Sequence, residues 1–364
     1  MSVYLGLMSG TSMDGIDVAL VDVASNKLLA AKTISFPNTI KKQLFELITE
    51  RQCRLQELAK LNVVIGRAFA DAANQLIKST DMLPTQIQAI GSHGQTIAHD
   101  ADGDIPYTIQ LGCPHTIAEL TGCKVVADFR TKDIVLGGRG APFAPIYHDV
   151  LFGHIEKSLA LVNIGGIANV SFLNQGKPPT GFDTGPGNCL MDAWIGKHHQ
   201  QPYDKHGAFA AMGQVIDPLL KRLISDPYIK KTGPKSIGKE YFSLSWLDGY
   251  IDNSPYTPED VQATLLAFTA RTVADAIISS SNQPVKILIC GGGAHNKQLL
   301  STLADYLPQH LVQTTAAHGI NPDYIEAMLI AWLASKALSN QALDMRAITG
   351  ANKPAILGTI YHPA

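Results

Sequence analysis

The feature of this 364-residue sequence that most constrains its fold is a strand–turn–strand unit that occurs twice. Residues 3–8 (VYLGLM) and 16–23 (IDVALVDV) are apolar, β-rich runs joined by glycine and hydroxyl residues. Residues 159–164 (LALVNI) and 168–173 (ANVSFL) repeat this arrangement around a Gly-Gly pair. Such runs, separated by a small-residue turn, predict β-hairpins. We therefore expect two related halves, each contributing one hairpin turn to a shared cleft.

Helices and further strands alternate along the rest of the chain. Apolar spacing predicts helices over residues 39–80, 259–282 and 322–340, and strands over 87–90, 125–130 and 285–290. This alternation predicts an α/β fold with helices covering the sheet faces. Residues 131–147 contain GGRGAP, which favours a crossover between two domains, although a surface loop gives the same pattern. The length also favours two domains, because single cores usually stop growing at about 250–300 residues.

Three glycine bends have the composition of phosphate-binding turns. They are residues 9–12 (SGTS), 165–166 (GG) and 291–293 (GGG). A phosphate chain needs several backbone N–H donors that converge on one point, and Cβ atoms obstruct that approach. Each bend alone fits an ordinary tight turn better, but their order along the chain resembles the actin/hexokinase/heat-shock-70 superfamily. The sequence contains neither GxxxxGK[ST] nor GxGxxG after its first strand, which disfavours a P-loop or a dinucleotide fold.

Charge and cysteine content exclude several classes of function. The 29 Lys and Arg residues nearly balance the 31 Asp and Glu residues, so we expect neither nucleic acid nor an anionic membrane as a partner. The five cysteines lack CxxC spacing, which disfavours disulfides and structural zinc. The N-terminal residues do not resemble a signal peptide, and no apolar run reaches the ~18 residues of a membrane span. These observations predict a cytoplasmic protein with a small-molecule ligand.

Eight short motifs, spread from end to end of the chain, carry a resemblance to a known family. They are residues 6–17 (GLMSGTSMDGID), 91–96 (GSHGQT), 127–130 (ADFR), 137–145 (GGRGAPFAP), 163–170 (NIGGIANV), 181–188 (GFDTGPGN), 290–296 (CGGGAHN) and 321–327 (NPDYIEA). Together they resemble the anhydro-N-acetylmuramic acid kinase family of that superfamily. The resemblance implies two domains of actin/hexokinase-like, ribonuclease H-like architecture with an interdomain cleft. We expect residues 1–130 plus about 347–364 in the first domain and 131–346 in the second.

The resemblance also implies the activity and the cofactors. Such an enzyme takes ATP with Mg²⁺ and the sugar 1,6-anhydro-N-acetylmuramic acid. It opens the anhydro bridge with water and transfers the γ-phosphate to O6, which yields N-acetylmuramic acid 6-phosphate and ADP in peptidoglycan recycling. A homodimer is compatible with the sequence, which does not decide the oligomeric state.

Asp183, in the segment GFDTGPG, is the candidate general base. Water that attacks the anomeric carbon must lose a proton, and a fixed carboxylate can accept it. An inverting glycosidase also needs an acid for the leaving oxygen. Here the γ-phosphoryl group can take O6 instead, so one carboxylate is enough. The alternative is an aspartate that caps a turn or a helix.

The candidate ATP-binding residues lie in the three bends. The resemblance assigns the first bend to the β- and γ-phosphates, the second bend to the same phosphates, and the third to the adenosine or the α-phosphate. The residues are Gly10, Thr11, Ser12, Met13, Asp14, Gly15, Ile16 and Asp17, then Gly165, Gly166 and Asn169, then Gly291, Gly292 and Gly293. Asp14, Asp17 or Glu326 are candidates for Mg²⁺, directly or through water. Close backbone packing and ordinary turn roles are the alternatives.

The candidate sugar-binding residues are polar or cationic. His93, Gln95 and Thr96 follow a short strand and offer hydrogen bonds to hydroxyl and acetamide groups. Arg130 and Arg139 suit the lactyl carboxylate of a muramic sugar, because a guanidinium pairs with a carboxylate through two hydrogen bonds. Glu326 begins an apolar helix and is a candidate contact of substrate or metal. The alternatives are a core histidine, salt bridges to Asp128 or Asp133, and a favourable helix-dipole charge for Glu326.

Three other functions compete with this prediction. A related sugar kinase would phosphorylate a free hydroxyl, with Asp183 deprotonating that hydroxyl. An ATP-driven conformational protein, as in actin or the heat-shock chaperones, would hydrolyse ATP slowly and bind a polymer or peptide. An ATP-independent glycosidase would leave the three glycine bends without a role.

Overall fold

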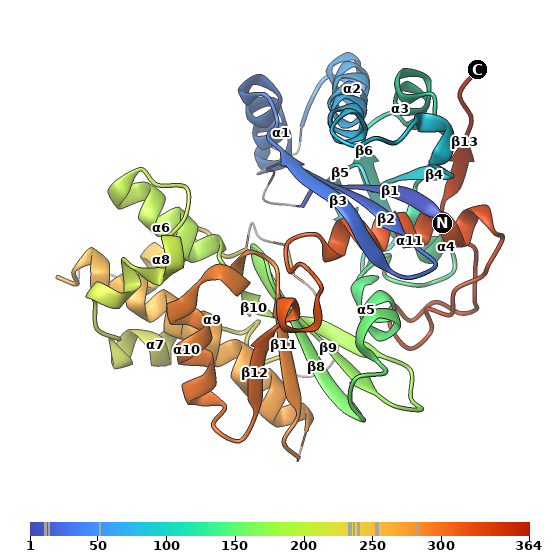
Figure 1. The fold of residues 1–364 in the computed structure, drawn as a ribbon. Helices are drawn as coiled ribbons and strands as arrows, with labels where there is room; N and C mark the ends of the chain where they lie inside the picture. Colours follow the sequence, from blue (N-terminus) through green and yellow to red (C-terminus); the bar gives the residue numbers. More distant parts are fainter. Residues whose placement is uncertain are drawn as a thin grey trace. The chain divides into compact units, whose positions relative to one another are not determined.

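The computed structural model describes residues 1–10, 13, 15–50, 52–231, 235, 237–238, 241–251, 255–281 and 283–364. These residues form two compact units, each built on its own β-sheet (Figure 1). The first unit contains Met1–Tyr147 and Tyr324–Ala364, and the second contains His148–Asp323.

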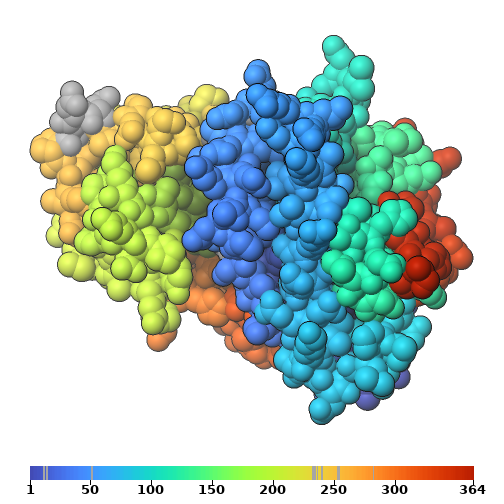
Figure 2. Space-filling model, turned by 90° about the horizontal axis from the view of Figure 1, so that it is seen from above, coloured from blue at the N-terminus to red at the C-terminus, as the bar shows by residue number. Residues whose placement is uncertain are grey.

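The first unit has a six-stranded sheet in the order β13-β7-β4-β1-β2-β3. Its strands are β1 (Val3–Met8), β2 (Ile16–Asp22), β3 (Lys27–Ile34), β4 (Ala89–Ser92), β7 (Val125–Ala127) and β13 (Thr359–Tyr361), and β5 (Gln95–Asp100) pairs separately with β6 (Tyr107–Leu111). Its helices are α1 (Asn38–Glu50), α2 (Leu55–Lys78), α3 (Pro114–Thr121), α4 (Phe129–Val135) and α11 (Ile325–Leu338), and α5 (Ala144–Phe152) continues into the second unit. Figure 2 shows the outer surface of α1 and α2 in blue.

Alternate residues of β1 pack against helices on opposite faces of this sheet. Leu5 and Leu7 join the core beneath α2, whereas Gly6 faces α11. A Cβ on Gly6 would overlap the backbone of Ala327, and one on Gly91 of β4 would overlap the backbone of Ile330. Close approach of α11 to the sheet therefore explains these two glycines.

The second unit has a five-stranded sheet in the order β10-β9-β8-β11-β12. Its strands are β8 (Ser158–Ile164), β9 (Ile167–Asn174), β10 (Thr180–Pro186), β11 (Lys286–Cys290) and β12 (Leu311–Thr314). Its helices are α6 (Cys189–His199), α7 (Asp217–Ile224), α8 (Leu244–Ile251), α9 (Pro258–Ser280) and α10 (Lys297–Tyr306). One sheet face, with Val162, Ile164 and Val170, packs into a core that includes α9.

The two sheets share one topology, which confirms the two predicted hairpins and the related halves. In each, the first three strands along the chain are antiparallel neighbours, and two later strands add in parallel beside the first. This is the topology of the ribonuclease H-like fold. The α/β class and the actin/hexokinase-like architecture of the units agree with the sequence prediction.

Several element boundaries differ from the predicted ones. The strand predicted over 125–130 ends at Ala127, because Asp128 turns the chain in a left-handed conformation (φ 60°) into α4. Residues 131–147, expected as a crossover or loop, include parts of α4 and α5. The helix predicted over 39–80 is two helices. Six strands were not predicted: β3, β5, β6, β10, β12 and β13.

The chain passes between units at 147/148 and 323/324, whereas the sequence placed these changes at 130/131 and near 346/347. Two sets of contacts explain the difference. Helix α11 packs on β1, β2 and β4. The loop after α4 is tied to the C-terminal segment, because Asp133 accepts a hydrogen bond from Thr349 (2.8 Å) and Thr349 O accepts from Arg139 N (3.0 Å).

Helix α9 is long and apolar enough to cross a membrane by length and composition alone. Most of its apolar stretch is buried inside the protein, and residues from Val261 to Ile277 belong to the core of the second unit. It is therefore a core helix of this fold.

Candidate active site

The buried side chain of Gln95 forms hydrogen bonds to the first glycine bend. Ser9 and Gly10 follow β1, and the Gln95 amide bridges them. Its Oε1 accepts a hydrogen bond from Ser9 Oγ (2.8 Å), and its Nε2 donates to Gly10 O (3.3 Å). Gln95, predicted to contact the sugar, thus positions the bend in this structure. Thr11, Ser12 and Asp14 lie outside the described residues.

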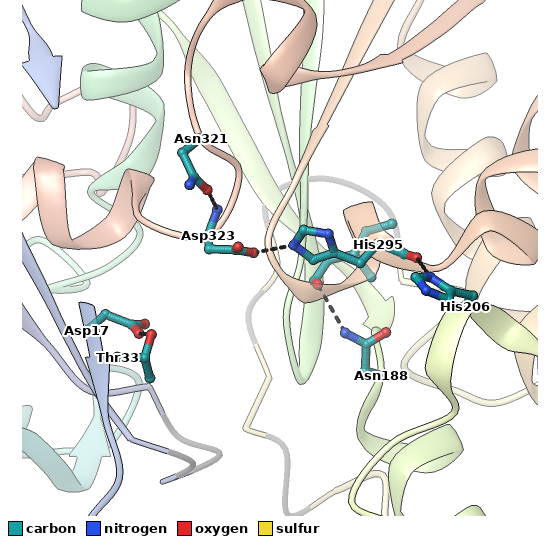
Figure 3. Close-up of polar contacts among 8 residues, drawn as sticks. Asp17, Thr33, Asn188, His206, His295, Asn321 and Asp323 are labelled. Atoms are coloured by element: carbon teal, nitrogen blue, oxygen red, sulfur yellow. Dashed lines mark hydrogen bonds and ion pairs between the residues drawn. The ribbon is translucent and has the colours of Figure 1, made fainter. Parts of the chain in front are cut away.

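The remaining predicted residues of the first bend are mostly packed inside the first unit. Met13 and Ile16 are buried in its core, so only their backbone is suited to a ligand. A Cβ on Gly15 would lie 2.9 Å from Ile34 O, which supports the close-packing alternative there. Asp17 is opposite Met8 in the hairpin and accepts a hydrogen bond from Thr33 Oγ1 (2.6 Å; Figure 3).

The second bend, Gly165-Gly166 between β8 and β9, has open space where side chains would stand. Among the described residues, a Cβ on Gly166 would meet no atom within 4 Å, and one on Gly165 would meet only Ile167 O at 3.7 Å. Neither glycine has a positive φ. Packing and backbone conformation therefore leave both glycines unexplained, whereas approach of a phosphate chain would require them.

The third bend packs against the second within the same unit. Gly291 has φ 76°, and a Cβ there would overlap Asn163 Oδ1. A Cβ on Gly293 would overlap the Ile164 side chain, so close packing accounts for both of these glycines. Gly292 differs, because its Cβ would have Asn188 Nδ2 as its nearest neighbour, at 3.5 Å.

Side chains that the sequence did not single out surround the third bend (Figure 3). Asn188 Nδ2 donates to Ile164 O (3.1 Å), between the second and third bends. His295 Nε2 lies 2.7 Å from Asp323 Oδ1, and His206 Nδ1 bonds to His295 O (3.0 Å). Asn188, His295 and Asp323 belong to motifs that carry the family resemblance, and this was the available signal for them.

Asp183 lies on strand β10, rather than in a turn or at a helix end. The β9–β10 pairing shifts register between Asp183 and Gly185, and such a bulge re-aims the side chain beside it. Asp183 pairs with Asn169, which in turn pairs with Asn163 on β8. Residues in register project from the same sheet face, so these three polar side chains form a row across three strands.

The carboxyl group of Asp183 has the protonation behaviour of a base that works near neutral pH. Burial raises its pKa to about 6, although a hydrogen bond from Ile237 N (2.9 Å, to Oδ2) and the charge of Lys235 both lower it. Burial outweighs these two effects because desolvation disfavours the charged carboxylate. At pH 7 most molecules carry the ionised form, which can accept a proton.

A second polar cluster lies in the first unit, around Arg130. Its Nε donates to His93 Nε2 (2.9 Å), and its Nη1 donates to Gly140 O (3.2 Å). Burial lowers the Arg130 pKa to about 10, whereas the charge of Glu326 raises it. His93, Arg130 and Glu326, which are far apart in the sequence, therefore form one group.

His93 in this cluster is a neutral ring with a defined tautomer. Burial and the nearby guanidinium lower its pKa to about 3. Because Nε2 accepts from Arg130, the proton is on Nδ1, which donates to Gly94 O (2.9 Å). His93 thus orients Arg130 and carries no charge of its own at neutral pH.

Two other candidates for the sugar have different surroundings. Arg139 forms a salt bridge with Asp102 (2.7 Å), and both side chains are exposed. This contact supports the salt-bridge alternative for Arg139, although with Asp102 instead of the aspartates expected. Thr96 Oγ1 accepts a hydrogen bond from Gln110 Nε2 (3.2 Å).

A pocket of about 240 Å³ opens in the first unit where β4 and β7 end. Its lining is largely polar and includes Ser92, His93, Gln110, Asp128 and Thr131. The Ser92 hydroxyl is buried and makes no hydrogen bond to the described residues. The carboxyl ends of parallel strands are the usual ligand edge of such sheets.

Of the carboxylates predicted to bind Mg²⁺, those that the structure describes suit an Mg²⁺ ion that is held mainly by a nucleotide. In the described part of the chain, no three His, Cys, Asp or Glu side chains are grouped to hold a metal by themselves. Mg²⁺ with a nucleotide usually needs only one or two carboxylates, besides phosphate and water. Asp17, at the turn end of its hairpin, fits that mode, whereas the charge of Glu326 already faces Arg130.

Comparisons with known proteins agree over nearly the full length. The model of the family described as anhydro-N-acetylmuramic acid kinase matches residues 2–363. The protein of that name from Legionella pneumophila (strain Corby) is 52% identical over 361 residues, covering 99% of this chain and 98% of the relative. The one from Xylella fastidiosa (strain Temecula1) is 47% identical over 367 residues, covering 99% and 96%.

A solved structure with a comparable fold is more distant in sequence. The activator of 2-hydroxyisocaproyl-CoA dehydratase from Clostridium difficile aligns with a TM-score of 0.49 and 13% identity, over 94% of this chain and 98% of its own. The assignment therefore depends on the family model and the sequence relatives. They show that this chain belongs to the anhydro-N-acetylmuramic acid kinase family.

Proposed function

We propose that this kinase uses ATP to convert 1,6-anhydro-N-acetylmuramic acid and water into N-acetylmuramic acid 6-phosphate and ADP. The observation that best supports this reaction is Asp183, a carboxylate with a pKa raised to about 6. It lies on β10, which pairs with β9, the strand that follows a glycine bend with room for a ligand. The named substrate of the full-length relatives supports the choice of sugar.

In the proposed reaction, Asp183 accepts a proton from water as the water oxygen bonds to C1 of the sugar. The C1–O6 bond breaks, and O6 bonds to the γ-phosphorus of ATP. The bond from that phosphorus to the β–γ bridging oxygen then breaks, and ADP leaves. Because the phosphoryl group takes O6, no separate carboxylic acid is needed for the leaving oxygen.

The bends supply the proposed nucleotide contacts. In the second and third bends, Gly165, Gly166 and Gly292 have room for a ligand among the described residues, so their backbone is assigned to phosphate or adenosine. The Ser9–Gly10 turn, held by Gln95, is assigned to the terminal phosphates. Bound Mg²⁺ would offset negative charge on these phosphates, with Asp17 as the described carboxylate that suits it.

The Arg130 cluster supplies the proposed sugar contacts. A guanidinium held by His93 and Gly140 keeps further N–H groups for the lactyl carboxylate. The negative charge of Glu326 balances the charge of the Arg130 guanidinium when the sugar is not bound. The hydrogen bond to His93 fixes the orientation of that guanidinium. Binding through a pre-oriented guanidinium loses little entropy on association.

Oxygen labelling tests the reaction directly. The protein is incubated with ATP, Mg²⁺ and the anhydro sugar in ¹⁸O-labelled water, and the product is quenched early and analysed by mass spectrometry. We expect one phosphate at O6 and one ¹⁸O at C1. Unlabelled product kept in labelled water for the same time controls for exchange. A 6-phosphorylated product that still contains the anhydro bridge, or a product with no label at C1, would contradict the proposal.

A cytoplasmic location and a homodimer remain proposals. The near-neutral charge balance and the absence of CxxC spacing in the sequence support a reducing compartment and a small-molecule ligand. Cell fractionation tests the location, and light scattering of the purified protein tests the oligomeric state.

A further inference from the structure

Asp226 is a buried carboxylate in the second unit that the proposed reaction does not use. It follows α7 and is 2% exposed. Its oxygens accept hydrogen bonds from Tyr228 N (2.8 Å), Tyr241 OH (3.1 Å to each oxygen), Trp246 Nε1 (3.1 Å) and Tyr250 OH (3.0 Å). A buried charge is costly unless its lone pairs are satisfied, and these donors satisfy them.

The donors to Asp226 belong to the part of the chain that contacts Asp183. Tyr228 OH donates to Asp183 O (3.1 Å). Lys235 O accepts from Asp183 N (2.9 Å), and Ile237 N donates to the Asp183 carboxylate (2.9 Å). Asp226 thus bonds to residues on both sides of the contacts that hold Asp183.

Aromatic packing attaches the same residues to the core. The Phe242 ring makes edge-to-face contacts with the rings of Tyr241 and Trp246, with ring centres 5.0 Å and 5.1 Å apart. The Trp246 ring in turn stacks on Phe268 of α9. An apolar residue at position 226 could fill the same space. Only an acceptor with two oxygens can fix the directions of these donors.

We propose that Asp226 is a positioning residue that anchors Tyr228, Tyr241, Trp246 and Tyr250, so that Tyr228 and Ile237 hold Asp183 in the orientation needed to take a proton from water. This inference depends on the proposed role of Asp183. Misalignment of a base by even 1 Å can reduce the rate by about two orders of magnitude.

The charged groups around Asp183 depend on the same anchor. Lys235 Nζ donates to Tyr228 O (3.2 Å) and lies 4.7 Å from the centre of the Tyr228 ring. The charge of Lys235 lowers the pKa of Asp183. Burial lowers the pKa of Lys235 itself, the charge of Lys231 lowers it further, and the charge of Asp226 raises it. Burial is the largest influence on Asp183, so loosening these residues should admit water and lower its pKa.

The test replaces Asp226 with asparagine, which keeps the shape but offers one acceptor where the carboxylate offers two. For Asp226→Asn we expect kcat to fall about tenfold or more, with KM values for ATP and sugar changing less than about threefold. The acidic limb of the kcat profile should move to lower pH, towards the ordinary aspartate range. A kcat and a pH profile that superimpose on the wild type would overturn the inference.

The matched control is Asp204→Asn. Asp204 is also buried in the second unit and accepts hydrogen bonds from Phe209 N (2.9 Å), Ala210 N (2.9 Å) and Gln262 Nε2 (3.3 Å), but none of these residues contacts Asp183. This variant should lower Tm and leave the pH profile unchanged. If Asp204→Asn shifts the profile as Asp226→Asn does, general loss of stability explains the effect and the inference fails.

Two further measurements keep the result interpretable. If Asp226→Asn does not fold, Tyr250→Phe removes a single donor and should lower kcat about threefold with a smaller shift of the acidic limb. An unchanged kcat and profile for Tyr250→Phe would then contradict the inference. Asp183→Asn separates the base role of Asp183 from the positioning role of Asp226. If Asp183→Asn remains active, the base role fails. If Asp183→Asn is inactive while Asp226→Asn has wild-type kcat and pH profile, only the positioning role fails.

Discussion

Arg130 Nε donates a 2.9 Å hydrogen bond to His93 Nε2, which joins the first turn of α4 to the residue that directly follows β4. The contact makes His93 an acceptor, so its proton must be on Nδ1. It also makes the guanidinium a fixed fork instead of a mobile charge. His93 therefore fixes the orientation of the Arg130 side chain. If Arg130 binds the sugar, loss of His93 should weaken sugar binding.

Replacing His93 with alanine should therefore impair sugar binding more than chemistry. We expect KM for the sugar to rise about tenfold, with kcat changed less than about threefold, because Arg130 loses its orientation but Asp183 is untouched. His93→Gln keeps an acceptor and should restore most of the affinity. Initial-rate kinetics with each substrate varied would check this. A rise in KM for ATP alone would contradict the assignment.

Asp183→Asn should abolish turnover and stabilise the fold at the same time. Loss of the proton acceptor should reduce kcat by about 10³-fold or more. The raised pKa means that the folded protein bears an unfavourable buried charge at pH 7, so removing it should increase the free energy of unfolding by about 1–3 kcal/mol. Denaturant unfolding and sugar binding by calorimetry would measure both effects. A destabilised variant would show that the carboxylate has other favourable partners.

The pH dependence of kcat follows from the same group. The folded pKa of Asp183 is about 6, so the base is ionised above that pH and protonated below it. We expect kcat to fall about tenfold per unit as the pH drops below 6. The linkage has the opposite sign for stability: a raised carboxyl pKa favours the folded state at low pH, and this contribution is lost as pH rises from about 4 through 6. Rates and unfolding midpoints measured from pH 4 to 8 would test both directions.

Gly166→Ala should weaken nucleotide binding without loss of stability. A Cβ there meets no atom of the residues that the structure describes within 4 Å, so Tm should stay the same or rise slightly, whereas KM for ATP should rise about tenfold or more. Gly249→Ala on α8, which also adds a Cβ in open space, is the control for nucleotide binding: alanine within a helix should raise Tm slightly, and KM for ATP should stay unchanged. An unchanged KM in Gly166→Ala would remove the second bend from the nucleotide site.

Gly6→Ala should destabilise the protein without touching the site chemistry. Its Cβ would overlap the backbone of Ala327 in α11, and such overpacking costs about 1–3 kcal/mol or more. Thermal unfolding would measure this, with Leu29→Ala on an exposed position of β3 as a surface control. Equal Tm values for the two variants would contradict the close packing of α11 on the sheet.

Local patterns predicted the hairpins well and the boundaries poorly. The runs at 3–8 and 159–164 are apolar and end in glycine turns, so their pairing needs only neighbouring residues. The strand at 125–130 was predicted too long, because the left-handed turn at Asp128 leaves no apolar signal. Strand β10 was missed because its residues, TGFDTGP, read as a turn and pair only through β9.

Chemical type and order along the chain were enough to determine the α/β class, the two related halves, the family resemblance and Asp183 as the candidate base. Tertiary structure alone decided what each group touches. Gln95 supports the first bend, Arg139 pairs with Asp102, and open space remains at Gly166. It also brought Asp226 into the surroundings of Asp183. The physical reason is that apolar periodicity and turns are local, whereas hydrogen-bond partners and burial depend on residues brought together only when the sheets and helices pack.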